Sequence, residues 1–226
     1  MPAPISVVIP TLNAATELSG SLGALMEGLA AGLIREVVIS DGGSDDATLH
    51  LAEEAGAELV TGPPSRGGQL RRGCAAARGD WILVLHADTQ LAPGWADVVA
   101  SHLQEGAGEA AYFQLRFRAK GAPPALVAGW ANLRARIFGL PYGDQGLLIR
   151  RSAYVAAGQY PDQPLMEDVA LVRRLKTLTP LPVAALTSAA RYQRDGWLRR
   201  GMRNLWILMR YLFGTDPDRL ARDYTK

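Results

Sequence analysis

The sequence predicts a single α/β domain in which helices flank a mostly parallel central sheet, with an amphipathic helix near its C-terminal end. Short apolar runs alternate with helical segments over roughly the first 90 residues, the order that parallel strands joined by crossover helices require. Polar residues directly follow several of these runs, as at the carboxyl ends of parallel strands. A chain of 226 residues is long enough for one large domain with a full core.

The run at 81–85, WILVL, is the centre of this prediction. It is short and uncharged, which indicates a strand buried on both faces, because a half-buried strand would alternate and a helix would be longer. The triplet His86, Ala87 and Asp88 then falls at the carboxyl end of the strand. Ligands bind outside these ends in open parallel sheets, so Asp88 is placed to hold a nucleotide or a metal.

The segments before this strand alternate in type. Strands are expected where β-branched residues end at Pro or at an Asp-Gly turn, and helices where alanine and leucine recur between such loops. In order, the expected elements are a strand at 5–9, a helix at about 14–31, a strand at 36–40, a helix at 47–55, a strand at 58–61, a loop at 62–68 and a helix at 69–77.

The second half is less regular. Residues 111–118 alternate apolar and polar from Phe113 on, which predicts a half-exposed strand, antiparallel and at or near the sheet edge. A helix is expected at 125–138, a short strand at 146–149 and a helix at 167–175. The last helix begins with two acids, which are favourable at the positive end of the helix dipole.

Composition and charge limit the class of protein. The single cysteine, Cys74, excludes an internal disulfide framework and fits a reducing cytoplasm. The apolar run at 5–10 is too short for a signal peptide, and no window approaches the roughly 18 apolar residues of a spanning helix. Residues 191–226 hold nine Lys or Arg against four Asp or Glu, although the whole chain has a net charge of only +2. No nucleic-acid partner is expected.

The helix expected from about Trp197 to Phe213 is strongly amphipathic. On a helical wheel one half of this helix is apolar, and the other half carries Arg199, Arg200, Arg203, Asn204 and Arg210. Ile207 and Tyr211 are the two exceptions to this separation. Its apolar half is expected to pack on the domain or on a second subunit as a homodimer. The alternative is an anionic membrane surface, which would suit a lipid-linked acceptor and a cytoplasmic protein at the inner face of the membrane.

Three strand ends carry polar loops that open onto one rim of a parallel sheet. A carboxylate such as Asp41 can accept from a base N–H or a ribose hydroxyl, and Asp88 can hold a divalent ion on phosphates. The glycine-rich segment at 65–73 carries three arginines and leads into a helix, which suits phosphate oxygens. Neither a Walker-A sequence nor G-x-G-x-x-G follows the first strand, which argues against NTPase and NAD-binding proteins.

Four segments, 5–13, 37–48, 66–88 and 166–168, together resemble the family 2 glycosyltransferases of the GT-A (Rossmann-like) fold, over most of residues 5–195. The segment GDQG at 143–146 is most similar to small bacterial members described as arsenosugar-biosynthesis glycosyltransferases. The resemblance implies a domain at 1–195, with a nucleotide-binding half at about 1–90 and an acceptor half at about 91–195. Residues 196–226 would form the C-terminal helix and tail.

The resemblance also implies which residues bind a nucleotide-sugar donor. The first loop would lie against the nucleoside, Asp41 would contact the nucleobase, and a basic segment would lie near the phosphates. The residues concerned are Pro10, Thr11, Asn13, Asp41, Ser44, Asp45, Arg66, Arg71, Ala87, Asp88 and Asp144. UDP is favoured over GDP as the nucleotide.

The implied reaction is an inverting sugar transfer to a hydroxyl-bearing acceptor. Asp88 matches the last acid of the family's D-x-D motif, which ligates a divalent metal, Mn²⁺ or Mg²⁺. Glu167 and Asp168 match the acidic pair whose aspartate is the general base. The alternative explanation of this pair is structural, because two acids at the start of a helix are favourable at the positive end of its dipole.

The sequence departs from the family motif at one metal-binding position, because His86 stands where the family has its first aspartate. There are three possible roles for His86: it ligates the metal, in which case it suits Mn²⁺ better than Mg²⁺; it hydrogen-bonds phosphate or sugar; or it is structural. Arg71 could equally lie on a solvated helix face, and Arg191 and Arg194 could reach a diphosphate or lie on the surface. A nucleotidyltransferase on a similar frame and a non-catalytic sugar-nucleotide-binding protein are the alternative functions.

Overall fold

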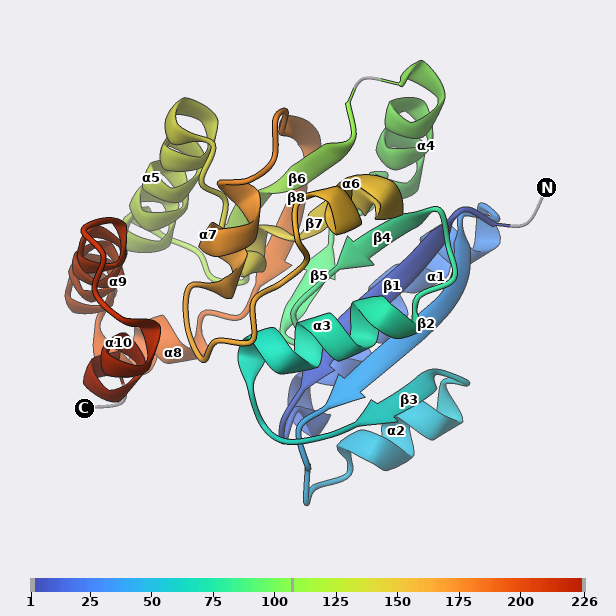
Figure 1. The fold of residues 1–226 in the computed structure, drawn as a ribbon, viewed down its shortest axis with the longest axis horizontal. Helices are drawn as coiled ribbons and strands as arrows, with labels where there is room; N and C mark the ends of the chain where they lie inside the picture. The colour runs from blue at the N-terminus through green and yellow to red at the C-terminus, as the bar shows by residue number, and fades with distance from the viewer. Residues whose placement is uncertain (1–2, 107, 225–226) are drawn as a thin grey trace.

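The structure is a computed structural model that describes residues 3–106 and 108–224. It is an α/β domain in which helices cover both faces of an eight-stranded sheet, and this confirms the predicted fold class (Figure 1). The strand order is β3-β2-β1-β4-β7-β6-β8-β5. All strands run in one direction except β7 and β5, which are antiparallel to their neighbours.

The strands are β1 (Ile5–Thr11), β2 (Ile34–Asp41), β3 (Glu58–Thr61), β4 (Trp81–Val84), β5 (Thr89–Leu91), β6 (Ala110–Phe117), β7 (Leu147–Arg150) and β8 (Thr179–Thr187). The helices are α1 (Ala15–Ala30), α2 (Thr48–Glu54), α3 (Arg66–Ala76), α4 (Trp95–Glu105), α5 (Ala122–Phe138), the short 3-10 turn η1 (Gly143–Gln145), α6 (Arg151–Ala156), α7 (Glu167–Val172), α8 (Ala190–Asp195), α9 (Trp197–Leu212) and α10 (Pro217–Tyr224).

Strand β4 lies in the middle of the sheet, between β1 and β7, and all four of its residues are buried. Ile82 and Val84 belong to the core on one face, which α3, α6 and α7 cover. Trp81 and Leu83 belong to the core on the other face, which α1, α2 and α4 cover. The prediction of a strand buried on both faces is therefore confirmed.

Several elements and one position differ from the prediction. Strand β5 and helices α4, α6, α8 and α10 were not expected, and no bounds were predicted for β8. Strand β5 has only three residues and carries too little pattern to be detected. Strand β6 lies inside the sheet between β7 and β8, so the expected edge position is wrong. Its alternation from Phe113 on has another cause: this end of β6 is exposed on one face and covered by α5 on the other.

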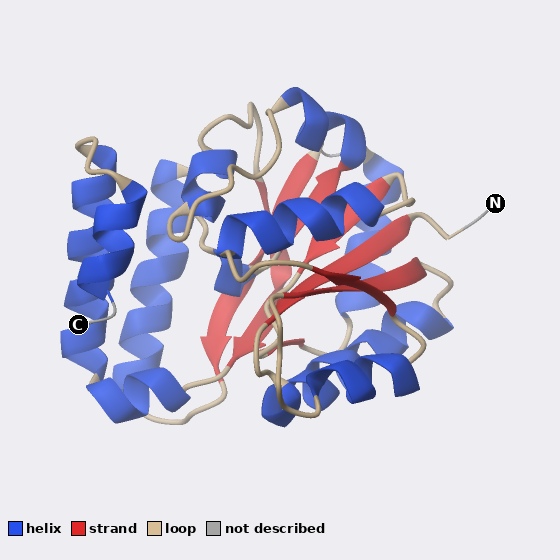
Figure 2. Ribbon diagram, turned by 60° about the horizontal axis from the view of Figure 1, so that its bottom comes forward, coloured by secondary structure: helices blue, strands red, loops and turns tan. Residues whose placement is uncertain are grey.

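Helices α5, α8, α9 and α10 gather at one end of the sheet, away from the N-terminus (Figures 1 and 2). Helix α9 packs against α5, α8 and α10. Within the described residues, every helix is too short or too polar to cross a bilayer.

Candidate active site

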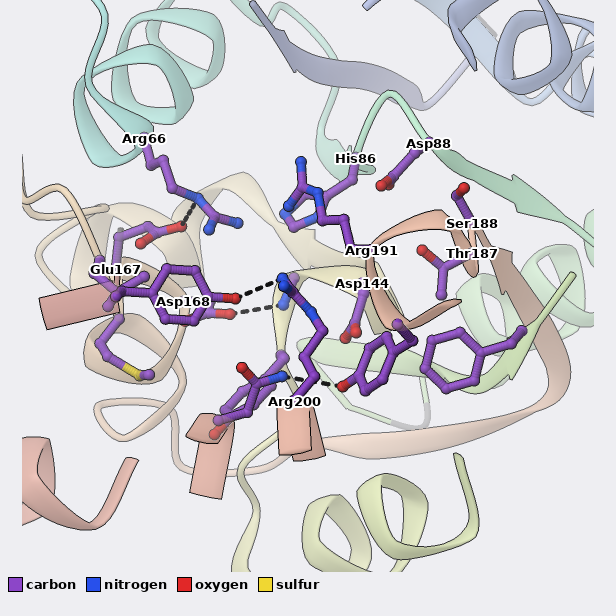
Figure 3. Close-up of a pocket in the computed structure, with 18 residues that line it drawn as sticks. Arg66, His86, Asp88, Asp144, Glu167, Asp168, Thr187, Ser188, Arg191 and Arg200 are labelled. Atoms are coloured by element: carbon purple, nitrogen blue, oxygen red, sulfur yellow. Dashed lines mark hydrogen bonds and ion pairs between the residues drawn. The ribbon is translucent and has the colours of Figure 1, made fainter. Parts of the chain in front are cut away.

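Two adjoining cavities open at the rim where the parallel strands end. The outer cleft runs along the loop after β1 and is lined by residues that include Pro10, Thr11, Asn13, Gln69 and Ala87. The inner pocket lies between β4, η1, α7 and the C-terminal helices, and its lining includes Tyr142, Asp144, Asp168, Tyr192 and Tyr224 (Figure 3). The two cavities share Arg66, His86, Asp88, Glu167, Ser188 and Arg191.

Asp41 lies beneath the outer cleft and is fully buried. Its Oδ1 accepts hydrogen bonds from the N–H groups of Gly43 and Ser44, each at 2.7 Å, and its Oδ2 accepts from the hydroxyls of Thr11 at 2.8 Å and Ser44 at 2.6 Å. Burial raises the pKa of Asp41, but these hydrogen bonds outweigh it, so that the pKa is lower than usual. The carboxylate thus fixes the loop after β2 to the end of β1.

Asn13 ties the same two loops together from the cleft side. It has a left-handed conformation, with φ of 51°, which asparagine tolerates better than most residues. Its N–H donates to the Ser44 hydroxyl at 2.8 Å, and its Oδ1 accepts from the Asp45 N–H at 2.9 Å. Ser44 and Asp45 therefore shape the loop that lines the cleft, although neither lines it.

Helix α3 begins earlier than the sequence indicated, at Arg66, because the Ser65 hydroxyl caps it by accepting from the Gly68 N–H at 3.3 Å. The early start places Arg66 in both cavities. Arg71 lines neither: it falls five residues later, about 140° around the helix, where it is exposed. For Arg71, the solvated helix face is the interpretation that its placement favours.

Gly67 shows that the glycines of this segment serve packing. A Cβ on Gly67 would lie 2.0 Å from the Pro161 carbonyl oxygen and 2.8 Å from the Gln163 nitrogen, both backbone atoms. We expect Gly67→Ala to lower the free energy of unfolding by about 3 kcal/mol, because the loop at 161–163 must move away. Urea unfolding would measure this. The control is Gly23→Ala in α1, where a Cβ meets nothing within 4 Å; we expect no loss there and a gain of up to about 1 kcal/mol. Equal stability of the two variants would contradict this packing role.

Glu167 and Arg66 form an ion pair across the two cavities. The Arg66 Nε lies 3.3 Å from Oε1 of Glu167, whose side chain is 2% exposed. Burial raises the pKa of Glu167 to about 7, against the opposing effect of the Arg66 charge. The Glu167 Oε2 is buried and has no hydrogen-bond partner among the described residues. Glu167 therefore holds Arg66 in place and still has one free acceptor.

Asp168 is held firmly at the start of α7. Its Oδ2 accepts from the Gly143 N–H and its Oδ1 from its neighbour Val169 N–H, each at 2.7 Å. The preceding residue, Met166, has a φ of 64°, a conformation that costs free energy for a methionine and that clusters at functional sites. The strained turn and the hydrogen bond to η1 aim the Asp168 carboxylate into the inner pocket.

The turn after β4 is fixed through all three of its carbonyl groups. The His86 oxygen accepts from the Thr89 N–H at 3.0 Å, the Ala87 oxygen from the Ser21 hydroxyl at 2.6 Å, and the Asp88 oxygen from the Ser188 N–H at 3.1 Å. These contacts leave the side chains of His86 and Asp88 at the junction of the two cavities.

His86 has an uncharged imidazole at neutral pH. Burial, and to a lesser degree the positive charge of Arg66, lowers the pKa of His86 to about 4. Gly143 provides the space for the ring, since a Cβ there would lie 2.3 Å from Nε2 of His86. A neutral imidazole has a free lone pair for a metal or for a hydrogen-bond donor.

Asp144 faces the inner pocket with an unsatisfied oxygen. Its Oδ1 is buried without a hydrogen-bond partner among the described residues, as is the Tyr142 hydroxyl. Burial raises the pKa of Asp144 to about 6. The Arg134 guanidinium lies 3.5 Å from the centre of the Tyr142 ring and supports this wall by a cation–π contact. Buried polar groups without partners in a pocket are suited to bind hydroxyl groups.

The far wall of the inner pocket was not predicted. It is made by Phe117, Tyr192 and Tyr224 together with Arg200 and Asn204 of α9. The Arg200 guanidinium donates to Asp195 at 2.6 Å and to the Tyr224 hydroxyl at 2.7 Å. No motif marks these residues; only the position of α9 and α10 beside the pocket reveals them.

The two arginines after β8 differ in position. Arg191 lines both cavities, whereas Arg194 lines neither and pairs with Asp195 at 2.7 Å. Arg194 therefore has the surface position, and Arg191 lies at the junction of the cavities.

The chain offers few donors for a metal at the junction of the cavities. The described residues contain no group of three or more His, Cys, Asp or Glu side chains arranged around an ion. Asp88 and His86 supply one carboxylate and one neutral imidazole, a combination suited to Mn²⁺. Such a pair fits an ion that takes its remaining ligands from a bound diphosphate and water.

The fold, with a cleft and acids at the ends of its parallel strands, is that of the GT-A glycosyltransferases. The S. aureus TarS 1-349 structure superposes with a TM-score of 0.64 at 16% identity, over 91% of this chain and 65% of that one. The glucosyl-3-phosphoglycerate synthase of Mycobacterium tuberculosis, crystallised with Mn²⁺, UDP and glucosyl-3-phosphoglycerate, superposes with a TM-score of 0.59 at 21% identity, over 89% and 78%. At these identities the likeness concerns the fold.

Within this class the chain belongs to Glycosyl transferase family 2, which residues 6–135 match. The glucosyl-3-phosphoglycerate synthase of Mycolicibacterium smegmatis is 36% identical over 93 residues, 37% of this chain and 30% of that protein. A PGL/p-HBAD biosynthesis glycosyltransferase of Mycobacterium tuberculosis is 35% identical over 99 residues, 40% and 38% of the two chains. The matches cover less than two fifths of these relatives. They support the family and do not single out the arsenosugar-type members.

Proposed function

We propose that this chain is an inverting glycosyltransferase that moves a sugar from a nucleoside-diphosphate donor, preferably a UDP-sugar, to a hydroxyl group of an acceptor. One observation carries the proposal: Asp88, Arg66 and Arg191 line both a cleft suited to a nucleotide and a pocket into which Asp168 points. Two fold relatives whose structures contain UDP or UDP-GlcNAc support the choice of nucleotide.

The outer cleft is the proposed donor site. Pro10, Thr11 and Asn13 would lie against the nucleoside, because they line the outer cleft and not the inner pocket. Asp41 would act at this end mainly through the loop that it holds, since all its hydrogen bonds are made within the chain. Arg66 and Arg191 would contact the diphosphate at the junction of the two cavities.

Asp88 and His86 would hold a divalent metal at that junction, with Mn²⁺ favoured over Mg²⁺ by the imidazole. A metal bound there would neutralise charge that develops on the diphosphate as the bond to the sugar breaks. Glu167 would contribute indirectly, by orienting Arg66 towards the same phosphates.

Asp168 is the proposed general base of the inner pocket. An acceptor hydroxyl next to its carboxylate would attack the anomeric carbon on the face opposite the diphosphate, which inverts that centre. The proton of the hydroxyl goes to Asp168, and the electron pair of the broken bond leaves with the nucleoside diphosphate. Asp144 and Tyr142, with free polar atoms in the same pocket, would bind hydroxyl groups of the sugar or the acceptor.

The segment at 143–146 supports a finer assignment within the family. It forms η1 and the glycine after it, and through Asp144 it lines the inner pocket. The segment is similar to small bacterial members described as arsenosugar-biosynthesis glycosyltransferases, and that group is the finer assignment that we propose within the family.

Calorimetric titration with UDP- and GDP-sugars, each with Mn²⁺, with Mg²⁺ and with a chelator, tests the donor site. We expect a UDP-sugar to bind at least about tenfold more tightly with Mn²⁺ than with the chelator, because Asp88 would hold the ion and the ion would add positive charge beside the diphosphate. Binding of nucleoside triphosphates in preference to every sugar nucleotide would favour a nucleotidyltransferase. Absence of binding to any nucleotide would overturn the proposal.

A further inference from the structure

Helix α9 carries its apolar residues on the outside. Leu198 is 76% exposed and Trp206 is 63% exposed. The exposed residues recur every three or four positions and form one stripe along the helix: Leu198, Met202, Leu205, Trp206, Met209 and Phe213. The expectation that the apolar half of this helix packs on its own domain is therefore wrong for most of that half.

The opposite side of α9 faces the domain and is partly polar. Arg200 is buried against Asp195 and Tyr224, and the Asn204 amide donates to the Tyr192 hydroxyl at 3.0 Å. Ile207, an exception in the wheel, is buried here. The polar contacts determine which side faces inward, and the exposed stripe is the consequence.

Helix α5 continues this apolar surface. Its exposed residues Leu126, Trp130, Leu133 and Ile137 also form one stripe. The two helices pack against each other where Gly201 of α9 faces Val127 of α5, since a Cβ on Gly201 would lie 3.9 Å from the Val127 methyl. They lie side by side at one end of the molecule (Figures 1 and 2). We call the two stripes together the α5–α9 face.

The charge on the two helices that make the α5–α9 face has one sign. Helices α5 and α9 contain six arginines and no aspartate or glutamate. Arg136 and Arg199 are exposed on these helices. In a symmetric dimer through this face, positive rims would approach each other at close range, which is unfavourable. An anionic lipid surface offers apolar depth and negative charge together.

We propose that the α5–α9 face binds the surface of an anionic lipid bilayer. Trp130 and Trp206 lie at the level of the headgroups, the aliphatic residues enter the upper acyl region, and the exposed Arg136 and Arg199 contact lipid phosphates. Arg200 and Asn204, on the opposite side of α9, line the inner pocket, so that the thickness of this helix separates a bound bilayer from the pocket. A lipid-linked acceptor would follow from this placement. That consequence rests on the proposed function, whereas the proposal that the α5–α9 face binds lipid does not rest on it.

Co-sedimentation of the full chain with vesicles tests the face. We expect sedimentation with vesicles of phosphatidylcholine and phosphatidylglycerol, and much less with phosphatidylcholine alone or in high salt. The variant Trp130→Ser/Trp206→Ser should bind at least about tenfold more weakly, because two large apolar anchors are lost. The matched control is Met26→Ser/Leu29→Ser, which removes two equally exposed apolar residues from α1 and should bind like the wild type.

Thermal unfolding of both variants would check that the fold is kept, which we expect because the replaced side chains are exposed. Failure of the wild type to sediment with any vesicle overturns the proposal, as does equal binding of the tryptophan variant or equal binding to neutral vesicles. Light scattering measures the oligomeric state. If the wild type is a dimer and Trp130→Ser/Trp206→Ser is a monomer, the α5–α9 face binds a second copy of the chain and not a bilayer. None of these readouts depends on sugar transfer, so the proposed function stands or fails separately.

Discussion

Asp168→Asn is expected to reduce turnover by about 10²–10⁴-fold, while the affinity for a UDP-sugar changes little. The amide cannot take a proton from the acceptor, so the attacking hydroxyl is no longer activated. The loss is specific to turnover because Asp168 lines only the inner pocket and not the proposed donor cleft. Steady-state kinetics of sugar release, together with calorimetry of donor binding, would measure both quantities.

The substitution has a structural effect that needs a control. Both oxygens of Asp168 accept backbone N–H groups, and an amide nitrogen cannot accept, so one of the two hydrogen bonds is lost. Asp144→Asn provides the comparison: it removes an acid from the same pocket, and Oδ1 of Asp144 has no hydrogen-bond partner to lose among the described residues. We expect a loss of about tenfold or less for Asp144→Asn. A larger loss for Asp144→Asn than for Asp168→Asn would assign the base to Asp144.

The strands of the first half were predictable because each is a short apolar run that ends at a polar loop. Residues 58–61 match β3 in both bounds. Alternate residues of β4 belong to the cores on the two faces of the sheet, as expected for a strand buried on both faces. The position of β6 was not predictable in the same way. Strand order depends on pairing between residues far apart in the chain, as between Leu115 and Ala185, and local alternation shows only which face is covered.

The acids of the site were predictable in kind, but the walls of the site were not. His86, Asp88, Glu167 and Asp168 stand directly after strands or at a helix start, and the structure brings them around shared cavities. Arg71 is exposed and lines neither cavity, because five residues of helix turn its side chain about 140° away from that of Arg66. Tyr192 and Tyr224 reach the pocket through packing of the last helices, which no local pattern encodes.

The amphipathic pattern of α9 shows a related limit. The wheel correctly separates apolar from polar residues, yet it does not say which side faces the domain. Several long polar side chains find partners inside, as Arg203 does with the backbone oxygens of Asp223 and Tyr224, and Arg210 with the Asp223 carboxylate at 2.7 Å. These contacts form with α10, a segment whose packing is not visible in the sequence.

Asp88→Ala is expected to abolish the gain in donor affinity that Mn²⁺ provides and to lower turnover by about 10²-fold or more. Asp88 is the carboxylate at the junction of the two cavities after β4, in a turn whose three carbonyls are all held. Replacing it by alanine would therefore remove the proposed metal ligand without releasing the loop. Calorimetry of a UDP-sugar with and without Mn²⁺ would measure the effect.

The control for Asp88→Ala is Asp80→Ala, an exposed acid at the other end of the same strand, which should leave the Mn²⁺ effect unchanged. His86→Asp is the complementary variant, because it restores two carboxylates separated by one residue. If the imidazole is a metal ligand, His86→Asp should bind the donor with Mg²⁺ nearly as well as with Mn²⁺, since a second carboxylate suits the harder ion. If His86→Asp keeps the preference for Mn²⁺ over Mg²⁺, His86 contacts phosphate or sugar and not the metal. If Mn²⁺ still raises the donor affinity of Asp88→Ala, Asp88 is not a metal ligand.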